Sequence, residues 1–267
     1  MANSRLFNTR GIVIGRRDQG EADRVLRLCT PEGKIEVIAK GARKVRSRKA
    51  GHIELFAHSA FVVARVKGSW DIVSKAETVE AHAALRDDLV RGSYARYFIE
   101  LLDRFFTQGE GEAALFDLLN HALTWLCEDD DLDLIARVYE QHLLGLAGFR
   151  PELFRCVEVH DGVKVVRPAQ HEDDGGASAV GFDPERGGVV CRACYEQRAI
   201  RERVMPLSPR VLRFLRACQT KPYTRLRGRA IPPQLHAQAE RVMLHYITHH
   251  LEQGLRSVAF LRSLRPR

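Results

Sequence analysis

Residues 11–49 read GIVIGRRDQGEADRVLRLCTPEGKIEVIAKGARKVRSRK, and this stretch carries the clearest fold signal in the chain of 267 residues. Its segment TPEGK, residues 30–34, has the composition of a turn, because Pro presets φ at about −65° and Gly accepts a positive φ. Apolar, β-branched runs lie on both sides of this turn, at residues 23–28 and 35–38. Two such runs around a turn predict a β-hairpin.

Three further runs extend the β-pattern on both sides of the hairpin. One precedes it at residues 11–15, and two follow at residues 59–66 and 70–79, separated by the turn KGS. Five short strands within roughly seventy residues match the strand count of a small closed or partly open barrel. Closure is favoured because an open five-stranded sheet would expose two unpaired edges. We therefore predict a small β-barrel in the N-terminal part of the chain.

The pattern becomes helical after about residue 83. Apolar residues recur there at spacings of three and four within residues 85–106, 114–126 and 134–146, which predicts three amphipathic helices. The acidic run EDDD at residues 128–131 lies between two of them. It suits a helix N-terminus through the helix macrodipole, and we prefer this interpretation to metal binding.

The last part of the chain is mixed. Glycines interrupt residues 151–198 and predict an irregular segment. Helices resume beyond it, where Ser208 and Pro209 have the residue types of an N-cap and a first helical position. A longer helix is predicted after the Pro-Pro pair at residues 232–233. The chain is therefore expected to be an α+β multidomain protein.

Composition bounds the class of protein. The chain is 45% apolar and 28% charged, as in ordinary globular proteins. The first nine residues lack the apolar core of a signal peptide, and no apolar run approaches the roughly twenty residues of a membrane span. Six cysteines at irregular spacings do not resemble a disulfide framework. We expect a soluble, cytoplasmic protein.

The formal net charge of +8 is unevenly distributed. Residues 1–50 carry thirteen Lys and Arg against five Asp and Glu, whereas residues 51–197 carry fourteen against twenty-six. Residues 198–267 carry fifteen against three. Two basic ends around an acidic middle indicate binding to a polyanion or docking to a partner of opposite charge.

The segment KGARKVRSRK, residues 40–49, has six cations and no acid. Arginine and lysine beside glycine and serine suit contacts with a phosphate backbone, although an isolated charged run is more often a solvated loop. Its position between two strands of a barrel favours nucleic-acid binding. The candidate residues are Arg10, Arg16, Arg17, Arg24, Lys34, Lys40, Arg43, Lys44, Arg46, Arg48 and Lys49.

Aromatic residues contribute little to this candidate site. Phe7, Phe56, Phe61 and Trp70 are of the type that stacks on bases, but core packing accounts for most of them. The sequence therefore predicts binding that does not depend on base sequence.

The cysteines contain one possible metal site. Cys191 and Cys194 have the C-x₂-C spacing that places two thiolates on one tetrahedral zinc ion, and Cys156 lies thirty-five residues upstream. Its expected mate three residues on is Val159, so His160, or else His171, is the candidate fourth ligand. The alternative is a degenerate site that packs without metal. The remaining cysteines, Cys29, Cys127 and Cys218, lie in apolar patterns and are expected in the core.

Motifs for catalysis are incomplete. HIE at residues 52–54 with the C-x₂-C pair lacks the proline and the short separation of a zinc deaminase. His245 and His249 share a helical face without an H-E-x-x-H motif, and GEG at residues 109–111 is a lone G-x-G. No P-loop and no G-x-S-x-G motif occurs. We expect a protein that is not an enzyme.

Several segments, in this order and spacing, resemble the RecO family of bacterial recombination mediators over nearly the whole chain. They are GIVI at residues 11–14, TPEGK at 30–34, AKGARK at 39–44, LLGLAGFRP at 143–151, and the stretch from Phe182 to Cys194 that ends in GGVVCRAC.

The resemblance implies a domain organisation. Residues 1–82 would form an N-terminal five-stranded OB-fold β-barrel, residues 83–150 and 199–267 an α-helical domain, and residues 151–198 a zinc-finger-like insert. Zinc-bearing relatives carry a second cysteine where this chain has Val159, and some relatives lack the zinc site.

The resemblance also implies a role in recombinational DNA repair, in the RecF pathway. Proteins of this family bind single- and double-stranded DNA and anneal complementary strands. They engage the single-strand-binding protein and work with RecR to load RecA. The acidic middle of this chain would repel DNA and is a candidate protein-docking surface. The acidic tail of a single-strand-binding protein would prefer the basic helices around Arg210, Arg213 and Arg216.

Two other classes of function remain open from the sequence. One is a protein adaptor that does not bind DNA and whose basic ends dock acidic partners. The other is a zinc-ribbon RNA-binding or transcription factor, which would need the metal to fold.

Overall fold

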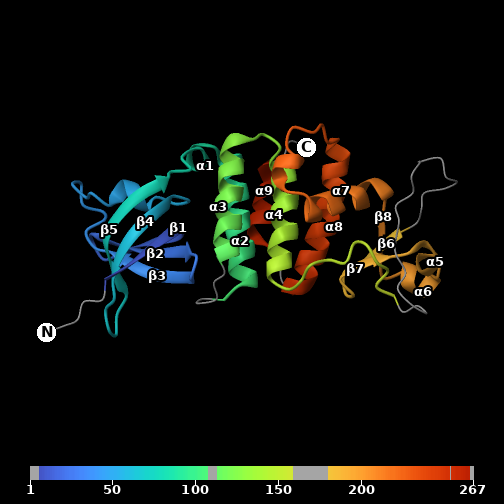
Figure 1. Cartoon of the computed structure of the whole chain (residues 1–267), viewed down its shortest axis with the longest axis horizontal. Helices are drawn as coiled ribbons and strands as arrows, with labels where there is room; N and C mark the ends of the chain where they lie inside the picture. Colours follow the sequence, from blue (N-terminus) through green and yellow to red (C-terminus); the bar gives the residue numbers. More distant parts are fainter. Residues whose placement is uncertain (1–5, 108–112, 159–179, 253, 265–267) are drawn as a thin grey trace. The chain divides into compact units, whose positions relative to one another are not determined.

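The computed structural model describes residues 6–107, 113–158, 180–252 and 254–264 (Figure 1). The chain forms two compact units. One contains Met1–Asp130 together with Arg256–Arg267, and the other contains Asp131–Leu255.

The first unit begins with a closed barrel of five strands, drawn in blue to cyan in Figure 1. The strands run in the order β1-β2-β3-β5-β4, and every neighbouring pair is antiparallel except β3 and β5. Their bounds are β1 Leu6–Gln19, β2 Asp23–Thr30, β3 Gly33–Ala39, β4 His58–Ala64 and β5 Asp71–Glu80. A short 3-10 helix, η1 (Ala50–Ile53), lies between β3 and β4. This is the strand order of an OB-fold, so the predicted fold class is confirmed.

Apolar side chains at alternating positions of the strands fill the barrel. Leu26 and Leu28 on β2, Val37 on β3 and Val73 on β5 belong to one buried cluster. The strand β1 is longer than the predicted run at residues 11–15, because its first half pairs with β4 and its second half pairs with β2. A long, bent strand shared by both sides is what closes the sheet, so no edge is left for aggregation.

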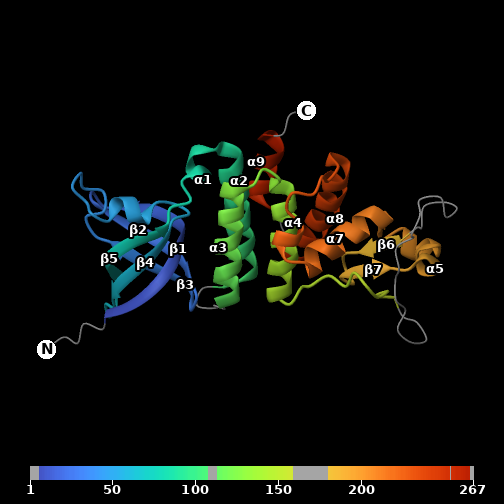
Figure 2. The same ribbon diagram turned by 45° about the horizontal axis from the view of Figure 1, so that its top comes forward.

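Four helices complete the first unit: α1 Ala84–Asp87, α2 Leu89–Phe105, α3 Ala113–Glu128 and α9 Arg256–Leu264. The Asp88 carboxylate caps α2 by accepting the backbone N–H groups of Val90 and Arg91. Gly92 is buried, and a Cβ there would collide with the carbonyl oxygen of Leu85. The absence of a side chain therefore lets α1 pack closely on α2. Figure 2 shows α2 and α3 side by side.

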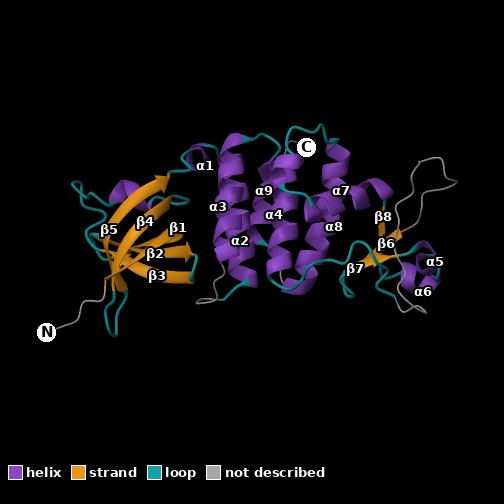
Figure 3. Ribbon diagram, in the orientation of Figure 1, coloured by secondary structure: helices purple, strands orange, loops and turns teal. Residues whose placement is uncertain are grey.

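The second unit combines helices with a small sheet, as Figure 3 shows by colour. Its three strands have the order β7-β6-β8 and lie beside short helices. The elements are α4 Leu132–Leu146, β6 Val180–Asp183, β7 Gly188–Val190, α5 Arg192–Tyr195, α6 Arg198–Arg201, β8 Met205–Leu207, α7 Pro209–Thr220, η2 Tyr223–Arg225 and α8 Pro233–Leu251. Asp131 caps α4 and Ser208 caps α7, as the sequence predicts for both helix starts.

No helix within the described ranges is both long enough and apolar enough to cross a membrane.

Candidate nucleic-acid interface and metal centre

Residues 40–49, which we call the basic loop, leave the end of β3 and lead into η1. The loop is attached to the turn between β1 and β2. The N–H of Gly41 donates to Asp23 Oδ1 (2.7 Å), and the N–H of Arg43 donates to the carbonyl of Ala22 (2.9 Å). Arg43 Nη1 also donates to the carbonyl oxygen of Gly20 (3.1 Å). The base of the loop is therefore fixed to the barrel.

Four cations of the basic loop point their charge at solvent. Lys40, Lys44, Arg46 and Arg48 are exposed, and none of them has an ion-pair partner within the described ranges. Val45, between two of them, is also fully exposed. An exposed run of uncompensated cations can follow a phosphate chain.

Three other candidate arginines belong to an ionic network that extends away from the loop. Arg43 Nε lies 3.3 Å from Asp18 Oδ2, and Arg24 Nε lies 3.1 Å from Asp18 Oδ1. Arg24 Nη1 and Arg16 Nη1 then lie 4.0 Å and 2.5 Å from the two carboxylate oxygens of Glu54. Three cations share two anions, so the network keeps a net positive charge.

Two candidate lysines have their ammonium groups engaged by the protein. Lys34 Nζ lies 3.1 Å from Asp103 Oδ1 and donates to the carbonyl of Phe106 (2.6 Å), and its side chain is only 13% exposed. Together with Arg27, which pairs with Asp103 at 2.5 Å, it attaches the barrel to α2. Lys49 donates to the carbonyl of Val73 (3.1 Å), and burial lowers its pKa.

The remaining candidates, Arg10 and Arg17, lie over aromatic rings. The guanidinium of Arg10 is 5.7 Å from the ring centre of Phe116, and that of Arg17 is 5.1 Å from the ring centre of Trp70. Trp70 is half-buried at the turn between β4 and β5. By contrast, Phe56 and Phe61 are each 1% exposed and belong to the interior.

The same turn carries two exposed cations that the sequence reasoning missed. Arg65 lies 5.0 Å from the ring centre of Phe7, and Lys67 is exposed next to it. The turn between β4 and β5 is one of the loops that bind oligonucleotides in OB-folds. The sequence signal for this second basic turn was KGS, which places a lysine beside a turn-forming glycine. In the structure Gly68 takes a φ of +77°.

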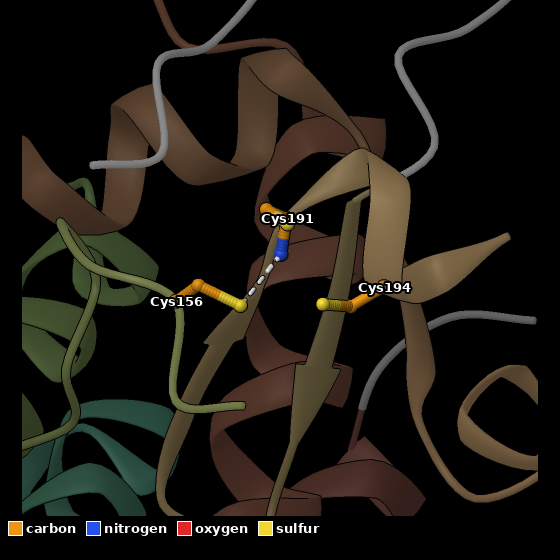
Figure 4. A group of neighbouring side chains, drawn as sticks. All are labelled: Cys156, Cys191 and Cys194. Carbon is orange, nitrogen blue, oxygen red and sulfur yellow. Dashed lines mark hydrogen bonds between the residues drawn. The ribbon is translucent and has the colours of Figure 1, made fainter. Parts of the chain in front are cut away.

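The second unit brings together Cys156, Cys191 and Cys194, whose sulfur atoms all lie within 4.8 Å of one another (Figure 4). Cys156 follows α4 in the chain, whereas Cys191 and Cys194 lie at the start of α5, directly after β7. The N–H of Cys191 donates to Cys156 Sγ (3.2 Å). The isolated cysteine and the C-x₂-C pair therefore meet, as the spacing predicts.

The three thiols fit a metal ion. Tetrahedral zinc, with Zn–S bonds of about 2.3 Å, holds its sulfur ligands about 3.8 Å apart, so a small contraction of the triad suffices. Burial, together with hydrogen bonds and charges from Cys191 and Cys156, raises the pKa of the Cys194 thiol to about 12. A cation reverses this effect because it stabilises thiolates. The candidate fourth ligands, His160 and His171, and Val159 lie outside the described residues.

Ion pairs hold the surroundings of the cysteine triad together. Arg203 pairs with Asp183 Oδ2 (3.0 Å) and with Glu158, which connects the segment after α6 to the end of β6 and to the segment that follows Cys156. The Asp183 carboxylate also accepts the N–H groups of Glu185 and Arg186 in the turn before β7. These contacts fix the backbone on both sides of the triad.

Arg216, which the sequence suggested as part of a docking surface, contacts the protein itself. Arg216 donates to the carbonyl of Leu153 and lies 4.6 Å from the ring centre of Phe154. Cys29 and Cys218 are buried, as predicted, and burial raises the pKa of each thiol. Cys127, which was also expected in the core, is only partly buried at the end of α3.

Comparison with known proteins covers both parts of the chain. Residues 1–82 match the family model described as recombination protein O N terminal, and residues 86–259 match the one described as recombination protein O C terminal.

Curated proteins named DNA repair protein RecO are similar over nearly the whole length. The protein from Roseiflexus sp. (strain RS-1) is 34% identical over 261 residues, covering 98% of this chain and 87% of that protein. The one from Symbiobacterium thermophilum is 34% identical over 262 residues, covering 97% and 98%. The one from Bacillus pumilus is 30% identical over 260 residues, covering 97% and 94%.

Proposed function

The chain belongs to the RecO family of DNA repair proteins, and from this premise we propose that it is a DNA-binding recombination mediator without catalytic activity of its own. It binds single- and double-stranded DNA through the barrel and anneals complementary strands. With RecR it assists the loading of RecA onto strands covered by single-strand-binding protein. Its place of action is the cytoplasm, at the nucleoid.

The observation that carries this proposal is the set of four exposed, unpaired cations on the basic loop, Lys40, Lys44, Arg46 and Arg48. Their loop is anchored to the turn between β1 and β2, one of the turns through which OB-folds bind oligonucleotides. Contacts with phosphate do not depend on the base, so the binding is independent of sequence.

Annealing follows from the same electrostatics. Two complementary strands repel each other, and a loop whose cations are not neutralised by the protein screens both polyanions. Arg17 over Trp70 adds one half-buried aromatic ring on which a base can stack. Lys34 does not belong to the proposed binding set, because its ammonium group connects the barrel to α2.

For the second unit we propose a structural zinc ion on Cys156, Cys191 and Cys194, with His160 as the fourth ligand. The zinc would hold the segment after α4 against the start of α5. This arrangement supplies folding energy rather than chemistry, because a site closed by four protein ligands leaves no open position for a substrate.

The proposal is tested by the salt dependence of oligonucleotide binding. In the variant Lys40→Gln, Lys44→Gln, Arg46→Gln, Arg48→Gln, we expect weaker binding of a fluorescent single strand. The slope of log K against log salt should flatten by about 0.7 for each lost phosphate contact, or about 2.8 for four. Fluorescence anisotropy at several salt concentrations measures both.

A matched pair of double variants controls for net charge. Arg46→Gln with Arg48→Gln should flatten the slope by about 1.4. Arg192→Gln with Arg198→Gln removes two exposed arginines that already pair with glutamates, and should leave the slope unchanged. Equal slopes in the wild type and the quadruple variant would contradict the loop assignment. A wild-type chain that does not bind oligonucleotide at low salt would favour a protein adaptor.

A further inference from the structure

A cavity of about 260 Å³ lies in the first unit, outside the basic loop. The segment Leu55–Phe56, just after η1, forms one wall, and α1 with the first turns of α2 forms the other. Three arginines, Arg16, Arg86 and Arg96, line it together with leucines. No element of the proposed zinc site contributes to it.

Two of the three arginines are held by neutral groups. Arg86 Nη1 donates to the carbonyls of Leu55 (3.0 Å) and Ala81 (2.7 Å). The guanidinium of Arg96 lies 5.9 Å from the ring centre of Phe56. Because carbonyls and rings do not neutralise charge, both cations are positioned in advance for an anion.

The acid in the lining does not compete for these arginines. The Asp88 carboxylate accepts the N–H groups of Val90 (2.8 Å) and Arg91 (2.9 Å), so it serves as the N-cap of α2. The third cation, Arg16, shares Glu54 with Arg24. The cavity therefore attracts negative charge.

The remaining walls are apolar and fixed. Phe56 has a φ of +70°, and both of its backbone groups are bound: its N–H donates to the carbonyl of Val13, and its carbonyl lies 2.9 Å from His82 Nδ1. Leu89 stands at the rim and is 63% exposed. A ligand that carries an anion next to a flat, largely apolar group matches both kinds of wall.

The ionic network described above connects this cavity to the basic loop. It begins at Arg43 in the loop, passes through Asp18, Arg24 and Glu54, and ends at Arg16 in the cavity lining. The network holds three arginines against two carboxylates, so a net positive charge lies between the loop and the cavity.

We propose that the cavity holds one unpaired nucleotide of a DNA strand whose neighbouring phosphates lie on the basic loop. The phosphate contacts Arg86 and Arg96, and the base lies against the leucines. A base that enters the cavity between these walls has left its base pair, so the ligand is single-stranded. This inference rests on the proposed DNA-binding function and adds to it a site for one unpaired nucleotide.

The test uses Arg96→Gln and Arg86→Gln in the full chain, with a fluorescent thymidine oligonucleotide and a duplex of the same length. Each variant should weaken single-strand binding and flatten its salt slope by about 0.7, and leave duplex binding unchanged. Arg262→Gln is the control, because it removes one exposed arginine from the same unit without touching the cavity. Arg96→Gln guards against misfolding, since the guanidinium of Arg96 lies over the Phe56 ring and, within the described residues, makes no hydrogen bond to the backbone.

Photo-crosslinking locates the strand directly. An oligonucleotide containing 4-thiothymidine should crosslink to peptides from both residues 40–49 and residues 85–96. If the quadruple loop variant loses strand binding while Arg86→Gln and Arg96→Gln behave as wild type, this inference fails and the proposed function stands. If instead an acidic peptide with an apolar end binds wild type and is lost in Arg96→Gln, the cavity belongs to a protein partner and the inference is overturned. If wild type does not bind the strand, both fail.

Discussion

His82 is a buried histidine at the point where the chain leaves the barrel for α1. Its Nδ1 lies 2.9 Å from the carbonyl oxygen of Phe56, and its Nε2 lies 3.2 Å from Thr124 Oγ1 on α3. Its backbone φ of +43° is one that few side chains accept. Burial lowers the pKa of His82. His58, buried against Phe116, has its pKa lowered for the same first reason.

The lowered pKa values predict how acid affects the first unit. Above about pH 6.5 both histidines are neutral whether the chain is folded or unfolded, so they do not change its stability. As the pH falls below this value, the two histidines become protonated in the unfolded chain but stay neutral in the folded unit. The free energy of unfolding therefore decreases. In His82→Asn this loss between pH 8 and pH 5.5 should be smaller, because asparagine does not titrate and tolerates a positive φ.

Urea unfolding at the two pH values measures this difference, and His245→Asn is the matched control. His245 is exposed on α8, so its removal should leave the pH dependence as in wild type. An identical acid loss in His82→Asn and wild type would show that His82 does not contribute.

The cations show where residue-level prediction from the sequence ends. The run at residues 40–49 was recognisable as a phosphate-binding candidate from composition alone. Which of its members are free was not, because the acids that engage the other candidates, Asp18, Glu54 and Asp103, are brought to them by strand pairing and by α2. The cavity beside Arg96 was equally hidden, since its walls come from segments about forty residues apart.

Secondary-structure elements were predictable where local periodicity is strong. The five strands, the hairpin turn at residues 30–34 and the helices α2, α3 and α4 are confirmed. The strands β6, β7 and β8 were missed, because each has only three or four residues and β6 pairs with β8 across more than twenty positions of the chain. Such short strands have no period of their own and exist only through tertiary pairing.

The segment around β7 and α5 provides a test of the zinc proposal. Cys191→Ser removes one of the three clustered thiols, and we expect the chain to lose its bound zinc and the second unit to unfold at lower temperature. Zinc per chain, measured by mass spectrometry of the purified protein, should fall from about one to about zero.

The control for this experiment is Cys127→Ser, which removes a thiol of the first unit that lies outside the triad. It should retain the metal. A wild-type protein that carries no zinc after purification from zinc-containing medium would show that the cysteines pack without metal. Oligonucleotide binding by the basic loop should be unaffected by Cys191→Ser, because the loop belongs to the other unit.

The path of the chain joins the two units twice. The chain enters the second unit at Asp131 and returns to the first at Arg256, so α9 at the C-terminal end packs on α2. Glu100 on α2 binds the first residues of α9. The Glu100 carboxylate accepts hydrogen bonds from the N–H groups of Arg256 (3.0 Å) and Ser257 (2.8 Å) and from the hydroxyl of Ser257. Burial alone would raise the pKa of Glu100, but these hydrogen bonds outweigh it and lower the pKa.

Glu100 therefore acts as the N-cap of a helix that is far away in the sequence, and removing it should release the second connection. In Glu100→Ala two backbone donors and one hydroxyl lose a charged acceptor, which typically costs about 1–3 kcal/mol. Hydrogen exchange at neutral pH should become faster in residues 256–264 and stay slow in the barrel strands. Glu77→Ala is the control, because Glu77 is an exposed carboxylate of the same unit that pairs with Lys75. Unchanged exchange in α9 of Glu100→Ala would mean that packing on α2, and not the cap, holds the C-terminal helix in place.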